Sequence, residues 1–247
     1  MLPIVILFYK PYGVISQFTP DGAWKTLSEF GPFPETVYPA GRLDADSEGL
    51  ILLTDDNGIK RRITEPRYMH PRTYAVQVER VPDGEAIETL RRGVMIEGEL
   101  TRHAEARLLP AEPDFPPRPV PIRFRKNVPT AWIELTLTEG RNRQVRKMTA
   151  AVGHPALRLV RTRIGDLTLD GLSPGTWRNL SADEIRILRG TDSPRPARRN
   201  KKPGRSSQPG AKFSRPGHPE AKAAPEGTVP RAGTGSRARG SSRPGKA

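Results

Sequence analysis

Two segments of this chain place apolar residues at every second position, and this period of two constrains the fold more than any other feature. In "RTYAVQVE", Tyr74, Val76 and Val78 share one face. In "AWIELTL", the residues at 131, 133, 135 and 137 are all apolar. This alternation predicts strands with one face buried against a core and the other polar. The chain therefore requires a sheet that is covered on one face.

Shorter signals complete a mixed α+β pattern. Apolar runs predict further strands at Ile4–Phe8 and Leu50–Thr54, and the proline-rich stretch Pro110–Val120 predicts a loop. Caps and helical spacing predict three helices, at Ile59–Thr64, Asp83–Arg92 and Arg143–Val152. Because few helices lie between successive strands, the sheet is expected to be largely antiparallel.

Charge is concentrated at the C-terminal end. The chain has 41 Lys+Arg and 27 Asp+Glu, and 14 of those basic but only 2 of those acidic residues lie within 193–247. That segment also holds 9 Pro and 8 Gly, so residues 191–247 are predicted to be a disordered basic tail. Two interpretations stay open, a solubilising appendage and a polycation that raises affinity for phosphate backbones.

Several classes of protein are excluded or disfavoured by what the sequence lacks. With no cysteine it has no disulfide, thiolate metal site or thiol nucleophile. Ile4–Phe8 is too short for a signal peptide or a membrane span, so a cytoplasmic protein without membrane contact is expected. There is no phosphate-binding or dinucleotide-binding glycine motif. No metal site is predicted, because the four histidines show no ligand spacing: His70, His103, His154 and His218.

The stretch "EGRNRQVRKM" places cations where a helix disfavours them. Val145, Met148 and Thr149 fall on one face of the predicted helix, which indicates core packing. Its first turns are crowded with basic residues, although the helix dipole repels cations there. Either the helix has an ordinary solvated basic face, or it binds an anion, which is a phosphate or a carboxylate from elsewhere in the chain.

The stretch "GRLDADSEG" offers such a carboxylate. Asp44 ends a Gly41-Arg42-Leu43 turn just before the buried run Leu50–Leu53. It is either an Asx-turn or cap residue, or a nucleophilic carboxylate that an arginine keeps ionised. The neighbouring Asp46, Ser47 and Glu48 are interpreted as support for the turn.

In order along the chain, "GRLDADSEGLILLT", "RTYAVQV" and "EGRNRQVRKM" closely resemble the rRNA pseudouridine synthases of the RsuA-like family. "YKPYGV" precedes these motifs and "RIGDLTLDGLSPGTWRNL" follows them. The resemblance spans about residues 4–185 and is nearest to the RluE-like large-subunit branch, which lacks the N-terminal S4 RNA-binding domain. It implies the pseudouridine synthase fold, a mixed, largely antiparallel central sheet with flanking helices.

By the same resemblance, Asp44 matches the catalytic aspartate, Tyr74 the active-site tyrosine, and Arg146 the basic residue that pairs with the aspartate. The sequence departs from the family pattern at two points. Tyr9-Lys10-Pro11 stands where Asn-Lys-Pro is common, and Arg72-Thr73-Tyr74 where Lys-x-Tyr is common. Both departures retain the cation, so they put details of RNA contact in doubt rather than activity.

The implied reaction breaks the N1–C1′ bond of a uridine in 23S rRNA, turns the base, and rejoins it through C5, with no cofactor. Asp44 would act covalently or by abstracting a sugar proton, and the residues do not choose between the two routes. Tyr74 fits as a ring under a flipped base, although spacing alone favours core packing beside Val76 and Val78. Seven cations are candidates for contacts with the RNA phosphates: Arg42, Arg72, Arg141, Arg143, Lys147, Arg161 and Arg163.

The predicted organisation is two subdomains, 1–70 and 71–190, that share the catalytic cleft in a monomer. Two other functions stay open. One is a non-catalytic RNA-binding or ribosome-assembly factor on the same scaffold. The other is a glycosidase-like hydrolase, which would need a second catalytic carboxylate, with Asp46 and Glu48 as the nearby candidates.

Overall fold

The computed structural model describes residues 2–122 and 125–190, and the tail predicted at 191–247 lies outside them. Nine strands in this part of the chain form one sheet, in the order β11-β1-β3-β9-β4-β8-β7, with β2 beside β3 and β10 beside β9. The strands are β1 Val5–Lys10, β2 Tyr38–Pro39, β3 Glu48–Thr54, β4 Arg72–Glu79, β7 Glu105–Leu108, β8 Thr130–Leu137, β9 Ala156–Ile164, β10 Leu167–Thr168 and β11 Trp177–Asn179. A separate hairpin pairs β5 (Met95–Ile96) with β6 (Glu99–Leu100).

Every pairing in the main sheet is antiparallel except that of β3 with β9, which is parallel. The prediction of a mixed, largely antiparallel sheet is therefore confirmed. The alternating segments are β4 and β8, which pair along their whole length. Ile133, Leu135 and Leu137 are buried, and they lie in one core cluster with Val76 and Val78.

The three predicted helices are present as α1 (Asn57–Thr64), α2 (Gly84–Arg92) and α3 (Gln144–Ala151). Asp56 and Asp83 cap the first two, because each side chain accepts a hydrogen bond from the backbone N–H three residues later. A fourth helix, α4 (Ala182–Arg189), was not predicted, although Ser181 and Glu184 form its capping box. Among the described residues, none of the helices combines the length and the hydropathy that a membrane crossing requires.

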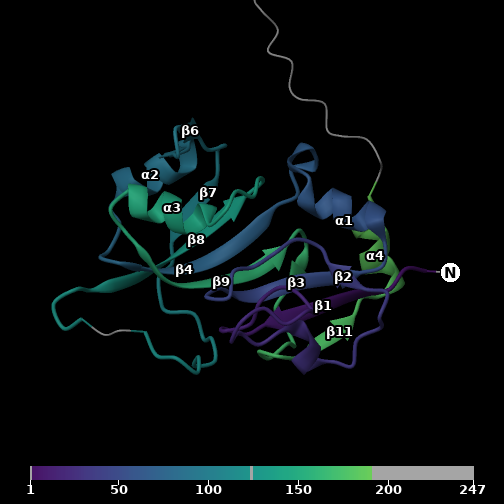
Figure 1. Cartoon of the computed structure of the whole chain (residues 1–247). Helices are drawn as coiled ribbons and strands as arrows, with labels where there is room; N and C mark the ends of the chain where they lie inside the picture. Colours follow the sequence, from purple (N-terminus) through teal and green to yellow (C-terminus); the bar gives the residue numbers. More distant parts are fainter. Residues whose placement is uncertain (1, 123–124, 191–247) are drawn as a thin grey trace, which may run out of the picture. The chain divides into compact units, whose positions relative to one another are not determined.

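The helices lie in two groups over one side of the sheet (Figure 1). Helices α2 and α3 cover the β4–β8 end, where Leu90 and Met148 pack into the same cluster as Val76. Helices α1 and α4 cover the β1–β3 end, where Ile59 and Ile185 pack against other core residues. A cavity lies between the two groups. The sheet is continuous through β9, which pairs with β3 on one side and β4 on the other, and the division into subdomains 1–70 and 71–190 stays a prediction.

The parallel contact between β3 and β9 depends on one glycine. Gly49 lies opposite Arg161 and has a φ of 106°, a region that favours glycine. A Cβ at this position would lie 2.3 Å from the backbone oxygen of Arg161. Gly49 therefore allows β9 to pass directly beside the start of β3, immediately after the loop that carries Asp44.

Candidate active site

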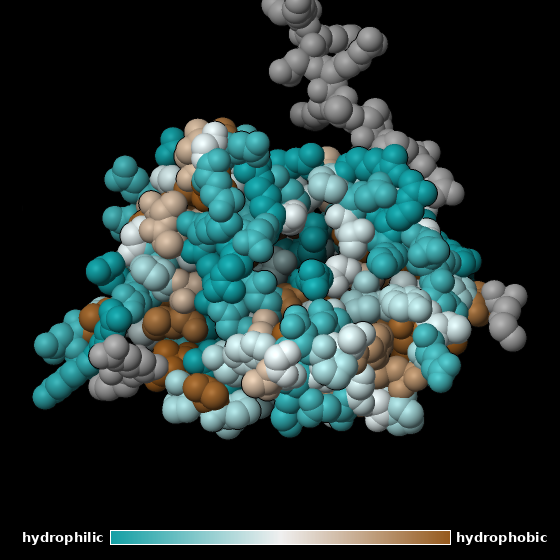
Figure 2. All heavy atoms as spheres, in the orientation of Figure 1, coloured by the Kyte–Doolittle hydropathy of each residue, from teal (hydrophilic) through white to brown (hydrophobic). Residues whose placement is uncertain are grey.

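A cavity of ≈ 520 Å³ opens between the two helix groups. Figure 2 shows it as a hollow near the centre of one face, surrounded mainly by hydrophilic residues. Its lining comes from the 40–45 loop, from Tyr74 of β4, from residues 139–145 at the start of α3, from the end of α1 and from β9. Motifs far apart in the sequence thus meet around one cavity.

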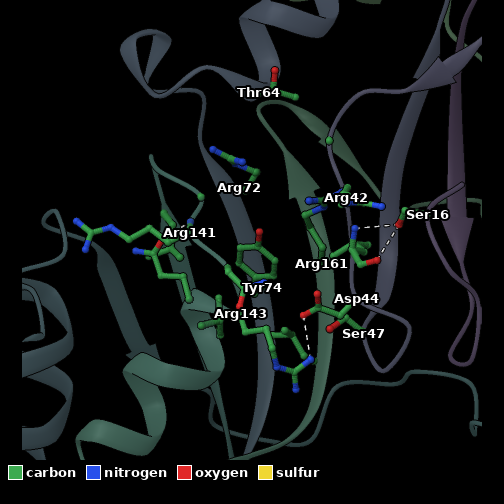
Figure 3. A pocket seen from close by; sticks show the side chains of 18 of the residues that line it. Ser16, Arg42, Asp44, Ser47, Thr64, Arg72, Tyr74, Arg141, Arg143 and Arg161 are labelled. Atoms are coloured by element: carbon green, nitrogen blue, oxygen red, sulfur yellow. Dashed lines mark hydrogen bonds and ion pairs between the residues drawn. The ribbon is translucent and has the colours of Figure 1, made fainter. Parts of the chain in front are cut away.

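The loop that carries Asp44 is fixed through its backbone. The hydroxyl of Ser16 donates to the Leu43 carbonyl at 2.7 Å and accepts from the Leu43 N–H at 2.9 Å. The Gly13 N–H donates to the Ala45 carbonyl at 2.8 Å, and the Ser47 N–H donates to the Asp44 carbonyl at 3.0 Å. The side chain of Asp44 lines the cavity and keeps 37% of its surface exposed (Figure 3). The turn therefore presents one carboxylate to the cavity.

Two arginines from the start of α3 bind this loop. Nη1 of Arg143 lies 3.3 Å from Asp44 Oδ2, and its Nη2 lies 2.8 Å from Asp46 Oδ2. Nη2 of Arg146 donates to the Asp46 backbone carbonyl at 2.8 Å and lies 3.4 Å from its carboxylate. The anion that the basic helix start requires is thus provided by the acidic loop.

This geometry corrects one expectation. Arg146 was expected to pair with Asp44, but in the structure Arg143 pairs with Asp44 and Arg146 pairs with Asp46. Arg143 reaches across because it precedes the helix in the left-handed conformation, with a φ of 50°. Arg146, one turn into the helix, is directed at the Asp46 backbone instead.

Arg143 and Arg146 together lower the pKa of Asp46. Burial acts to raise the Asp46 pKa, but the hydrogen bond from Arg143 and the charges of Arg146 and Arg143 outweigh it and lower the pKa. The pKa of Arg146 is lowered, chiefly because that side chain is buried, whereas the hydrogen bond to Asp46 raises the pKa of Arg143. Asp46 therefore binds both arginines, whereas Asp44 pairs only with Arg143.

Tyr74 lines the cavity from β4 and is half-buried. Its direct partner in the neighbouring strand is Arg161 of β9, so both side chains emerge on the same face of the sheet. Figure 3 shows the Tyr74 ring beside Asp44 and Arg161. The ring also packs against the cluster that contains Val76 and Val78. The two interpretations of Tyr74 are thus compatible, because the ring covers the core and faces the cavity.

The seven candidate RNA contacts fall into different environments. Five line the cavity: Arg42, Arg72, Arg141, Arg143 and Arg161. Lys147 does not line it and pairs with Glu97 at 2.7 Å, while Arg163 is exposed outside the lining. Arg161 is only 4% exposed. It cannot track phosphates on the surface as expected, because it lies on the central strand of a covered sheet.

Two further charged groups are buried, the Glu48–Arg158 pair and Lys10, and this burial was not predicted from the sequence. Glu48 and Arg158 form a buried ion pair with contacts of 2.9 and 2.8 Å, which holds Glu48 away from the cavity lining. Lys10 is fully buried, and its Nζ donates to the Val14 carbonyl at 2.7 Å. Burial lowers the Lys10 pKa to about 7. In the sequence, Lys10 directly follows the apolar residues of β1, and Glu48 directly precedes those of β3. This position next to an apolar run was the local indication that the two charges are buried.

No group of three His, Asp or Glu side chains suited to metal binding occurs in residues 2–122 and 125–190. Asp44, Tyr74 and several arginines are the candidate functional residues that line the cavity.

Comparison with known proteins agrees with this arrangement. Residues 4–151 match the family model described as RNA pseudouridylate synthase. The chain is 54% identical over 173 residues to a protein of Xanthomonas axonopodis pv. citri named ribosomal large subunit pseudouridine synthase E, covering 69% of this chain and 90% of that protein. It is 38% identical to ribosomal large subunit pseudouridine synthase B of Bacillus subtilis, covering 76% and 72%. A solved structure described as a pseudouridylate synthase superimposes with a TM-score of 0.63 at 30% identity, covering 76% of this chain and 74% of the other.

Proposed function

The chain belongs to the RNA pseudouridylate synthase family, within its RluE-like large-subunit branch, and from that premise we propose that it converts a specific uridine of 23S rRNA to pseudouridine, with Asp44 as the catalytic carboxylate. The observation that carries the assignment of Asp44 is its position. Its carboxylate lies at a cavity of ≈ 520 Å³, on a loop fixed by the backbone, beside an aromatic ring. A cavity of this size is typical of sites for small molecules or single nucleotides.

A base within a folded RNA is inaccessible to a carboxylate inside a cavity, so the target nucleotide has to leave its stack and enter the cavity. There, Asp44 acts on the sugar or base, either covalently or by abstracting a sugar proton. Arg143 contacts the Asp44 carboxylate at 3.3 Å and orients it, and Asp46 holds Arg143 in turn. Tyr74 supports the base with its ring and places its hydroxyl near the proton that leaves C5.

The RNA backbone is bound at the mouth of the cavity by Arg42, Arg72, Arg141 and Arg143, which lie on three different segments of the lining. Arg141 is partly fixed by Glu139 and by the Leu100 carbonyl, so its position requires little reorganisation. Action as a monomer is part of this proposal. Ribosomal RNA as the substrate supports a cytoplasmic location.

Tritium release from 5-labelled uridine in 23S rRNA tests the proposal. Asp44→Asn removes the charge at nearly constant volume and should abolish release, by about 10⁴-fold or more, while RNA binding persists. Asp46→Asn is the matched control, because it alters the same ion-pair cluster without touching the reacting carboxylate, and it should retain measurable release. Equal release by the wild type and Asp44→Asn would refute the role of Asp44.

The same assay separates the other two functions. A non-catalytic RNA-binding factor would bind the RNA without releasing tritium, even as the wild type. A glycosidase-like hydrolase would liberate free uracil and needs a second carboxylate near the first. Glu48 is held by Arg158, and Asp46 is held by two arginines. These ion pairs favour the isomerase over the hydrolase.

A further inference from the structure

Arg161 is a buried cation without a carboxylate partner among the described residues. Its side chain is part of the cavity lining, yet the residue is only 4% exposed. Its Nε donates to the Leu50 carbonyl at 2.6 Å, which fixes the guanidinium plane. Its Nη2 is buried and has no hydrogen-bond partner in the described structure. Burial lowers the Arg161 pKa, the Tyr74 side chain opposes this through its charge and a hydrogen bond, and a second cation, Arg72, lowers the pKa further.

Such a group is costly for a folded protein. An arginine side chain stays charged in proteins, and a buried charge without a partner destabilises the fold. The other buried arginine of β9, Arg158, has its carboxylate in Glu48. An unpaired N–H donor in a cavity wall therefore indicates that something from outside the described chain completes it. The donor calls for an acceptor oxygen that carries negative charge at least for part of the reaction.

The depth of Arg161 decides what that acceptor is. Arg141 and Arg143 keep 27% and 41% of their side chains exposed and lie where RNA phosphates can reach. Arg161 lies deeper, beside the half-buried Tyr74, as Figure 3 shows. The charged backbone of RNA remains hydrated outside the cavity, while a flipped base enters it. The group that reaches Arg161 is thus the base.

We propose that Nη2 of Arg161 donates a hydrogen bond to a carbonyl oxygen of the flipped uracil and stabilises the negative charge that the base carries while it is detached from the ribose. The inference rests on the proposed function and identifies Arg161 as the group that stabilises the leaving base. It also gives Arg161 a role in the reaction that differs from a phosphate contact.

The electron balance requires such a partner. When the C1′–N1 bond breaks, its electron pair stays on the uracil, and the negative charge spreads over N1 and the two carbonyl oxygens. On the sugar, C1′ either bonds to the Asp44 carboxylate or forms a double bond as Asp44 takes up a sugar proton, and this bond or proton transfer is reversed when C5 attacks C1′. After the base turns, C5 forms the bond to C1′, the C5 proton is lost, and N1 takes up a proton. Arg161 exchanges no proton in these steps. A fixed cation in a site that excludes water stabilises the intermediate charge without reorganisation.

The experiment compares two leaving groups in single-turnover reactions on an RNA fragment that carries the target. One fragment contains uridine and the other contains 5-fluorouridine, whose base is more acidic and leaves more easily. Loss of the original N-glycoside is followed for both. Arg161→Met should slow uridine cleavage by about 10²-fold, the typical loss for one donor to a developing anion. The loss with 5-fluorouridine should be at least about 10-fold smaller, because that base depends less on external stabilisation.

Two variants on the same strand serve as controls. Arg158→Met removes the other buried arginine and should slow both substrates equally, to the extent that the fold is weakened. Arg161→Lys keeps the charge and should recover part of the rate with uridine. Thermal unfolding of each variant shows that the protein used is folded.

The outcomes separate the two proposals. If Arg161→Met slows both substrates by the same factor, as Arg158→Met does, Arg161 acts only on the architecture and the inference is wrong. If the wild type leaves the uridine of the fragment and of intact 23S rRNA unchanged, the proposed function itself fails. A larger defect with uridine than with 5-fluorouridine supports the contact with the leaving base.

Discussion

At the scale of single residues, the centre of the site is one guanidinium that bridges two carboxylates. Arg143 lies closer to Asp46, at 2.8 Å, than to Asp44, at 3.3 Å. Asp46 is also held by Arg146 through both its carboxylate and its backbone carbonyl. Asp46 therefore fixes the arginines, and Asp44 keeps one side of its carboxylate free for a substrate.

The two arginines should respond differently to substitution. Arg143→Gln removes the contact with Asp44 and should lower kcat by about 10²-fold, while unfolding free energy changes by less than about 1 kcal/mol, since the pair is exposed. Arg146 is 14% exposed and donates to the carbonyls of Asp46 and Ala156. Arg146→Gln should therefore cost about 2–3 kcal/mol of stability as well as activity. Kinetics and urea unfolding of both variants check this. Wild-type kcat in Arg143→Gln would contradict the pairing.

Lys10 should give the protein a distinct pH dependence of stability. Burial lowers its pKa to about 7 in the folded chain, from the ordinary value of 10.5. Between these pH values the unfolded chain binds the additional proton, so the free energy of unfolding rises with pH in this window. The contribution is about 1.4 kcal/mol per pH unit. It reaches its maximum above the unfolded pKa and disappears as pH falls to about 7.

The comparison of wild type with Lys10→Met isolates this contribution. Urea unfolding at several pH values between about 7 and 10 should show a steeper rise for the wild type than for the variant. A constant offset between the two, from the missing hydrogen bonds to Pro11 and Val14, leaves the slope unaffected. Identical slopes would mean that Lys10 titrates at its ordinary pKa.

At the scale of elements, the site depends on the contact between β3 and β9, because it brings the loop of Asp44 next to Arg161. Gly49→Ala tests this contact. The new Cβ would lie 2.3 Å from a backbone oxygen, at a φ of 106°. The substitution should cost more than about 3 kcal/mol, because the two strands have to separate. Urea unfolding measures the loss, and activity should fall with it.

Gly84→Ala is the matched control. Gly84 begins α2, and a Cβ there meets nothing within 4 Å. Alanine in a helix is more favourable than glycine, so this variant should be neutral or more stable by up to about 1 kcal/mol. A Gly49→Ala protein as stable as the control would show that β3 and β9 tolerate a wider spacing.

The elements also show what the sequence could predict. Strands β4 and β8 were predictable because alternation reports a half-buried face, and α1 and α2 because their caps are local signals. Strand β9 was missed, although it is central in the sheet. Its buried positions include Arg158 and Arg161, and arginines in a short apolar segment suggest a surface. Their burial depends on Glu48 and on the Leu50 carbonyl, each about 110 residues away. No local pattern contains that information.

In the site, too, local motifs were predictable and contacts between distant residues were not. Asp44 and Tyr74 were predicted through motifs, and the start of α3 was predicted to require an anion. Which arginine takes which carboxylate depends on the left-handed backbone of Arg143 and the direction of α3. A one-turn difference along a helix decides that pairing, and residue spacing alone does not determine it.

At the scale of the whole molecule, charge is divided between two parts of the sequence. The segment 193–247 holds 14 of the 41 basic and 2 of the 27 acidic residues, which leaves nearly balanced charge in residues 1–192. The arginines of the cavity are local cations, and two of them, Arg141 and Arg143, are held by acidic neighbours. If the segment acts as a polycation, recognition of the target nucleotide and long-range attraction to RNA are separable functions.

Truncation before Ser193 tests the polycation interpretation of that segment. The cavity lining lies wholly within residues 15–164, so the truncated protein should keep its single-turnover rate on a short RNA at saturating concentration. Its affinity for long rRNA should fall, and the salt dependence should become shallower by about 0.7 in log K against log[salt] for each RNA phosphate that the protein no longer neutralises. Filter binding at several salt concentrations measures both quantities. If the 14 cations bind phosphates, the full-length protein releases more counterions and has the steeper slope. An unchanged affinity and slope in the truncated protein would therefore rule out the polycation interpretation and leave the solubilising role.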